Sequence, residues 1–173
     1  MSFTSQSIPI ESLKSSLLLG VVQYYSDIKK GRFAPSWDDF DLFKLAPPAV
    51  KFTSVIDVIA PTPTFRYRFW GTGLREIVGA EMTGKTVHEN PDRDLAKILA
   101  AGYAKVVDAK APRLFEEKLT SGGGSKFATL TLRLPLSDNN DDVDKIVSVT
   151  DFAEKMPDIK HAARNHFGYS TPY

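Results

Sequence analysis

Apolar residues recur at helical spacing in two parts of the chain. The first predicted helix spans residues 10–30 and ends where Lys29, Lys30 and Gly31 provide a stop. The second spans residues 90–110, with Asn90 as the expected cap and Pro91 as its first helical residue. The two apolar stripes consist of Leu13, Leu17, Val21, Tyr24, Tyr25 and Ile28 in the first helix, and of Leu95, Ile98, Leu99, Tyr103 and Val106 in the second.

Alternating and β-branched segments predict five strands. Residues 51–59 and 64–70 form the first two, which the turn sequence APTP joins. Residues 112–120, 126–137 and 143–152 form the last three, which follow one another through the short turns SGGGS and DNNDD. Connections this short join antiparallel neighbours, so these three strands are expected to form a meander. Shorter helical pieces are expected within residues 31–50 and 71–79.

The segment GAEMTGKT, residues 79–86, has the letters of a phosphate-binding loop. Such a loop follows a buried strand and opens directly into a helix, because its backbone N–H groups must converge on the phosphate. Here the preceding residues LREIV read as a helix, and the following helix starts several residues too late. A turn that leaves Lys85 solvated is the favoured interpretation, and a nucleotide-binding enzyme acting through Lys85 is kept as a remote alternative.

Composition restricts the remaining chemistry. The chain has 173 residues, is 42% hydrophobic and 25% charged, and carries a formal net charge of +1. This balance indicates one globular domain and gives no sign of a nucleic-acid partner. The absence of Cys excludes disulfides, thiol nucleophiles and cysteinyl cofactor adducts. The N-terminus lacks a basic leader and the stretch LLLGVV is too short to span a bilayer, so we expect a cytoplasmic protein without membrane contact.

No other candidate site meets its chemical requirements. Asp138, Asn140 and Asp142 are spaced like the start of a calcium loop, but valines occupy the positions of its essential Gly and Glu. Glu116 and Glu117 are adjacent in a predicted strand, so they point to opposite faces and cannot act together as an acid and a base. Of the three histidines, His161 and His166 lie in the weakly patterned tail, and a single loop histidine such as His88 is more often a surface or turn residue than a ligand. We therefore predict no catalytic and no metal site.

Three phrases of the sequence resemble a bacterial PAS-like family whose function was long unassigned. These are GRFAPSWDDFD, FRYRFWGTGLREIVGAEMTGKTV and LRLPLSDNNDDVD, within roughly residues 15–152. The resemblance implies an α+β fold with a five-stranded antiparallel sheet, helices packed on one face and an extra N-terminal helix. It divides the chain into an N-terminal helix at 1–30, a PAS-like domain at 31–152 and a tail at 153–173.

The resemblance also implies a non-enzymatic sensory domain that binds a small ligand and signals to a separate protein. A protein-interaction or dimerisation module without a ligand is the alternative. The cofactor is unknown: family members hold haem, flavin, organic acids or nothing visible. The long helix has no His to ligate haem, which leaves His88 as the one conceivable substitute.

If a ligand binds, we expect it between the sheet and the long helix, where apolar walls with a few polar groups can converge. The two tyrosines are the preferred contacts, since a buried phenol needs a hydrogen-bond partner. The predicted ligand-binding residues are Phe65, Tyr67, Phe69, Leu99, Tyr103, Leu132, Leu134, Val147 and Val149.

The stripe of the first helix lies outside the expected sheet-and-helix unit. It must therefore dock either on the chain's own sheet or on another chain. A homodimer through this helix is the favoured prediction.

Overall fold

The computed structural model describes residues 2–120 and 126–152 and shows an α+β fold built on one antiparallel sheet. Its strands are β1 (Ser2–Ile8), β2 (Thr53–Ile59), β3 (Thr64–Trp70), β4 (Arg113–Thr120), β5 (Lys126–Leu136) and β6 (Lys145–Asp151). They lie in the order β1-β4-β5-β6-β2-β3. The helices are α1 (Ser16–Lys29), α2 (Pro47–Lys51), α3 (Thr72–Val78) and α4 (Arg93–Ala109), with 3-10 turns η1 (Ile10–Ser12), η2 (Leu42–Lys44) and η3 (Val87–Glu89).

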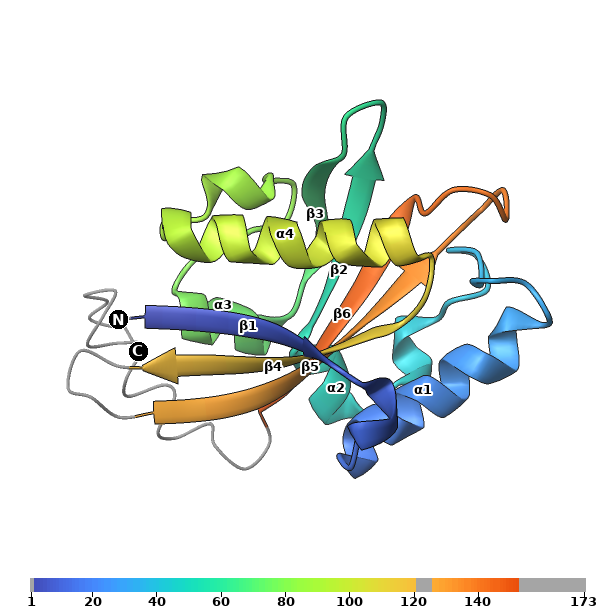
Figure 1. The fold of residues 1–173 in the computed structure, drawn as a ribbon, viewed down its shortest axis with the longest axis horizontal. Coiled ribbons are helices and arrows are strands. Elements are labelled where there is room, and N and C mark those ends of the chain that lie inside the picture. The colour runs from blue at the N-terminus through green and yellow to red at the C-terminus, as the bar shows by residue number, and fades with distance from the viewer. Residues whose placement is uncertain (1, 121–125, 153–173) are drawn as a thin grey trace.

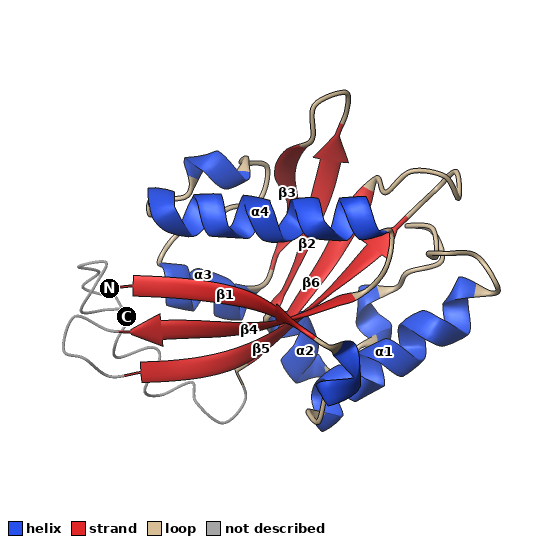
Figure 2. Ribbon diagram, viewed as in Figure 1, coloured by secondary structure: helices blue, strands red, loops and turns tan. Residues whose placement is uncertain are grey.

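The sheet has six strands, so the predicted count of five was one too low. The five predicted strands correspond to β2–β6. The first predicted helix, α1, precedes them in the chain, and α3 and α4 lie between β3 and β4. The additional strand is β1, which pairs antiparallel with β4 from Ser2 opposite Thr120 to Ile8 opposite Leu114. Figure 2 shows how strongly the sheet twists, with β1, β4 and β5 running across the view and β2 and β3 rising steeply.

Both faces of the sheet are covered, each by its own core. On one face α1 buries Leu18, Val21 and Tyr25 in a cluster that includes Leu132 and Val147. On the other face α3 and α4 pack over a second cluster, and Figure 1 shows α4 crossing the strands. The first helix therefore docks on the chain's own sheet, and the expectation of helices on one face holds for α3 and α4 alone. The homodimer remains a prediction. The apolar stripe of the first helix no longer argues for it, because this stripe packs on the chain's own sheet.

Local signals explain where the two longest helices begin. The hydroxyl of Ser15 caps α1 by accepting a hydrogen bond from Leu18 N, so this helix starts later than the predicted residue 10. The cap of α4 is Asp92, whose carboxylate accepts from the N–H groups of Asp94 and Leu95. The predicted cap Asn90 is instead buried and accepts from Asp92 N. The predicted boundary was therefore wrong by two residues.

No helix within residues 2–120 and 126–152 combines the length and the apolar character that crossing a membrane requires. Over the same ranges, no group of three or more His, Cys, Asp or Glu side chains is placed to hold a metal ion. The predicted tail at 153–173 lies outside the described residues.

Candidate ligand-binding pocket

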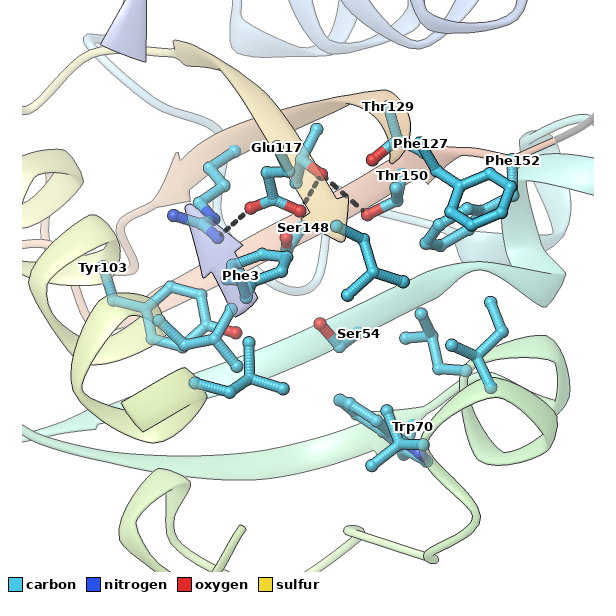
Figure 3. Close-up of a pocket in the computed structure, with 18 residues that line it drawn as sticks. Phe3, Ser54, Trp70, Tyr103, Glu117, Phe127, Thr129, Ser148, Thr150 and Phe152 are labelled. Carbon is cyan, nitrogen blue, oxygen red and sulfur yellow. Dashed lines mark hydrogen bonds and ion pairs between the residues drawn. The ribbon is translucent and has the colours of Figure 1, made fainter. Parts of the chain in front are cut away.

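A cavity of about 120 Å³ lies between the sheet and helices α3 and α4. Its helical wall is apolar, and Trp70 of β3 and Phe152 after β6 extend this apolar lining. Its floor is the sheet, which contributes hydroxyls, a carboxylate and a guanidinium (Figure 3). The apolar helical residues are Leu74, Ile77, Val78, Leu95 and Leu99, and the strands also contribute Phe3, Leu119 and Phe127.

The polar floor follows from strand alternation. On β5 the side chains of Thr129, Thr131 and Arg133 all point toward the pocket, because residues two apart share a face. The register sets Arg133 opposite Ser148 of β6, which in turn lies opposite Ser54 of β2. Polar residues of neighbouring strands thus form a continuous row across the middle of this face. The row consists of Glu117, Thr129, Thr131, Arg133, Ser148, Thr150 and Ser54.

A buried ion pair lies at one end of this row. Arg133 Nη2 donates to Glu117 Oε1 at 2.8 Å, and the two side chains are 1% and 8% exposed. Thr131 Oγ1 donates to Glu117 Oε2 at 2.8 Å and lies 2.9 Å from Thr150 Oγ1. Figure 3 draws this chain of contacts above the cavity. A charge pair removed from water to this degree is maintained only by such close geometry and additional hydrogen bonds.

The Arg133 guanidinium is held in place by aromatic rings and by α4. Its Cζ lies 4.3 Å from the ring centroid of Phe115 and 4.9 Å from that of Tyr103, distances typical of cation–π contacts. A Cβ atom added to Gly102 of α4 would lie 1.8 Å from Arg133 Nη1. Because residue 102 is a glycine, the guanidinium can approach the backbone of α4 this closely. Nε and Nη1 have no hydrogen-bond partner among the described residues.

Two buried tyrosines lie at the site: Tyr103 lines the cavity, and Tyr67 packs behind its wall. Burial is the main reason that the pKa of Tyr103 is raised, although Arg133 and the nearby hydroxyls of Tyr67 and Ser54 oppose the rise. Burial also raises the pKa of Tyr67 well above its usual range, and the Tyr103 phenol adds to this effect. Both phenols are therefore neutral at physiological pH. The Tyr67 hydroxyl lies close to Tyr103 but lacks good hydrogen-bond geometry to any described residue.

The structure divides the nine predicted ligand-binding residues among three places. Leu99 and Tyr103 line the cavity. Phe65 and Tyr67 are buried on the same face but pack behind the wall, against Tyr103 and Trp70 respectively. The others belong to the core that α1 covers, so the prediction that they face the long helix was wrong. They are Phe69, Leu132, Leu134, Val147 and Val149.

A β-bulge explains the position of Phe69. Tyr67 lies opposite Ile56, but Phe69 lies opposite the next residue, Val55, so Arg68 has no partner of its own on β2. The extra residue reverses the alternation of side chains along β3. Phe69 consequently turns toward the α1 core, and Trp70 takes its place at the pocket.

Sequence reasoning missed the polar row. The available signal was the segment TLTLRLPL, where threonines and an arginine alternate with leucines inside a predicted strand. The prediction that Glu116 and Glu117 point to opposite faces of the strand is confirmed. Glu116 forms a surface ion pair with Lys118 at 2.8 Å, whereas Glu117 is buried against Arg133.

The phosphate-loop letters form a turn, as the favoured interpretation predicted. Helix α3 precedes the segment and a 3-10 turn follows it. Gly84 N donates to Tyr67 O at 2.7 Å and Lys85 N donates to Met82 O at 2.9 Å, so these amides are already bonded to protein. The Lys85 side chain is exposed.

No family model and no curated protein sequence matches this chain. Solved structures match weakly. An RNA-binding light-oxygen-voltage receptor aligns with 96% of this chain at 12% identity and a TM-score of 0.43, and this chain spans 43% of its length. The light-state Aureochrome1 LOV domain aligns with 70% of this chain at 14% identity and a TM-score of 0.40, with 94% of its own length covered.

A third match is VqmA in the Vibrio cholera VqmA–ligand–DNA complex. It has 16% identity and a TM-score of 0.45, and it covers 76% of this chain and 58% of its own. The low identities transfer no residue role to this chain.

Proposed function

We propose that this chain is a non-enzymatic, PAS-like sensory module that binds a small molecule between its sheet and helices α3 and α4. The observation that carries the proposal is the row of polar side chains on a sheet face covered by apolar helices, with a cavity between the two. Ligand sites combine largely apolar walls with a few convergent polar groups in this way. A face meant only for packing would carry apolar residues here, because buried polar groups need compensating bonds.

The same side chains argue against a catalytic role for the pocket. The Glu117 carboxylate accepts hydrogen bonds from both Arg133 and Thr131, so it is not available as a general base. Both bordering phenols have raised pKa values, which disfavours proton transfer through them near neutral pH. Binding followed by contact with a separate protein is the activity that this arrangement supports best.

A module for dimerisation or protein interaction without a ligand is the second candidate. A fully packed interior would have favoured it, whereas the interior holds a cavity of about 120 Å³. The side chain that favours it is Phe43, which is 92% exposed in η2 and is not part of the pocket lining. An exposed Phe offers apolar surface to a protein partner, which also suits a sensor that signals by contact.

Native mass spectrometry of the purified protein tests the proposal. We expect a bound small molecule in the wild-type protein and its loss in Leu99→Trp, since Leu99 lines the cavity and the larger ring fills it. The control is Leu19→Trp, the same substitution at a residue of α1 that is 46% exposed and outside the pocket. It should retain the bound mass. A wild-type protein without any bound mass, and without stabilisation by any compound in a broad screen, would contradict the proposal.

A further inference from the structure

We infer that the pocket selects an electrically neutral molecule of about one ring in size that carries a hydrogen-bonding group. This inference rests on the proposed function and specifies the chemistry of its ligand. It follows from the charge of the lining, from the hydroxyls that face the cavity, and from the size of the space.

The charges of the described lining cancel. Glu117 and Arg133 are its one carboxylate and its one cation, and they form an ion pair at 2.8 Å. A carboxylate ligand would meet the Glu117 charge as well as Arg133, and an ammonium ligand would meet Arg133 as well as Glu117. Either ion would lose its hydration without a net opposite charge to replace it. A neutral molecule avoids this loss.

Arg133 cannot offer a ligand the two parallel N–H groups that bind carboxylates best. Nη2 is bonded to Glu117, and Nη1 lies so close to Gly102 that an added Cβ would be 1.8 Å away. The rings of Tyr103 and Phe115 cover the guanidinium at 4.9 and 4.3 Å. Nε and Nη1 both lack a hydrogen-bond partner in the described part of the chain, but Nη1 is packed against Gly102, so Arg133 can offer a ligand at most the single donor Nε.

The serine hydroxyls are the better partners for a ligand. Ser148 and Ser54 lie opposite each other on β6 and β2, and both line the cavity. Figure 3 shows the Ser54 hydroxyl between the Tyr103 ring and Trp70, on the floor of the space. A hydroxyl can donate or accept, so this pair suits an alcohol, phenol, ketone or amide and has no preference for an ion.

The volume sets the size. The cavity of about 120 Å³ is slightly smaller than an engineered apolar cavity of about 150 Å³ that holds benzene. A single ring therefore fills most of it. The apolar side chains of α3 and α4 would contact the ring, and the polar substituent would meet the serines.

Four probes of similar size separate the possibilities: benzyl alcohol, toluene, benzoate and benzylammonium, titrated into the full chain at neutral pH by calorimetry and ligand-observed NMR. We expect benzyl alcohol to bind best. Toluene should bind about three- to tenfold more weakly because it offers the serine hydroxyls no hydrogen bond, and both ions should bind about 100-fold more weakly because they lose hydration. Benzoate or benzylammonium as the tightest probe would overturn neutral selection while leaving ligand binding by this pocket intact.

Substitution of the ion pair gives a second test. Glu117→Gln leaves the positive charge of Arg133 without its counter-charge, so benzoate should bind about tenfold more tightly than to wild type. Glu116→Gln is the matched control, because Glu116 lies on the other side of the same strand and pairs with Lys118. It should change nothing. Equal benzoate binding by wild type and a folded Glu117→Gln variant contradicts the inference, and the wild-type probe series decides the matter if that variant does not fold.

A result without probe binding is also decisive. If no probe binds but the protein copurifies with a molecule, the charge of that molecule supports or refutes neutral selection. If no probe binds and nothing copurifies, both this inference and the proposed function fail.

Discussion

Replacement of Gly102 by Ala tests the packing of the Arg133 guanidinium against α4. In an ordinary helix this change would stabilise the fold by about 1 kcal/mol, since Ala has the better helix propensity. Here the new Cβ would lie 1.8 Å from Arg133 Nη1 and 3.0 Å from Cζ, so one group must move. A side-chain end on the surface would move easily. This one is 1% exposed, forms an ion pair and lies within cation–π distance of two rings.

The expected magnitude follows from what the displacement breaks. Loss of a buried ion pair with one charge left uncompensated destabilises by about 3–5 kcal/mol. With the helix propensity gain of about 1 kcal/mol subtracted, Gly102→Ala should lower the free energy of unfolding by about 2–4 kcal/mol. Urea titration followed by far-UV circular dichroism measures this as a lower midpoint at an unchanged slope.

Gly20→Ala is the matched control, because Gly20 lies in α1 and an added Cβ there meets nothing within 4 Å. It should stabilise the protein by about 0.5–1 kcal/mol. In an Arg133→Met, Glu117→Gln background the clash is removed, and Gly102→Ala should no longer destabilise. A Gly102→Ala protein as stable as Gly20→Ala would refute the assignment of Gly102 to this contact.

Two further predictions concern a tyrosine pair and an acid-sensitive turn. Tyr25→Phe should lower the free energy of unfolding by about 1–2 kcal/mol, because the Tyr25 hydroxyl donates to Pro135 O at 2.9 Å in the core. Tyr67→Phe removes a buried hydroxyl without a well-placed partner, so it should not lower this free energy. Equal losses of stability for the two variants in urea titrations would contradict this prediction. The Trp37 N–H, together with Lys145, holds the pKa of Asp138 below its usual range. The Asp138 carboxylate therefore stabilises the fold fully at pH values above its unfolded-state pKa of about 4. This stabilisation is lost as the pH falls through the lower folded-state pKa. The difference in stability between wild type and Asp138→Asn should therefore be constant above about pH 5 and shrink in more acidic solution, and a difference that grows on acidification would show that the sign is wrong.

The sequence predicted most of the sheet because local signals determine its strands. Each of β2–β6 alternates or is rich in β-branched residues, and Gly, Pro, Asn and Asp mark the turns between them. β1 was missed because SFTSQSI is too polar to read as a buried strand. It is stabilised by pairing along β4, which a sequence more than a hundred residues away provides. The local sequence pattern of residues 2–8 therefore cannot predict this pairing.

The sequence predicted the pocket between the correct elements, the sheet and the long helix, but it predicted the wrong strand residues for the floor of the pocket. An apolar row such as Leu132 and Leu134 was expected to face the long helix, on the assumption that helices cover one face of the sheet. Once α1 covers the other face, these leucines belong to its core and the alternate residues Thr131 and Arg133 face α4. The choice between the two rows depends on which helix packs where, and that is a tertiary property.

The bulge at Arg68 is equally invisible to alternation. A single unpaired residue reverses the sides of Phe69 and Trp70, although the letters FRYRFW alternate without interruption. Bulges are set by the register between two strands and not by the composition of either.

β1 has two structural roles: it covers one edge of β4, and it contributes to the lining of the pocket. β1 occupies the outer side of β4 from Ser2 to Ile8, and its Phe3 lines the pocket. Proteolytic removal of this peptide would bare the N–H and C=O groups of β4, and bare strand edges recruit strands from other molecules. The same cleavage would remove Phe3 from the lining of the cavity. Loss of ligand retention and the onset of strand-mediated polymerisation would then occur together.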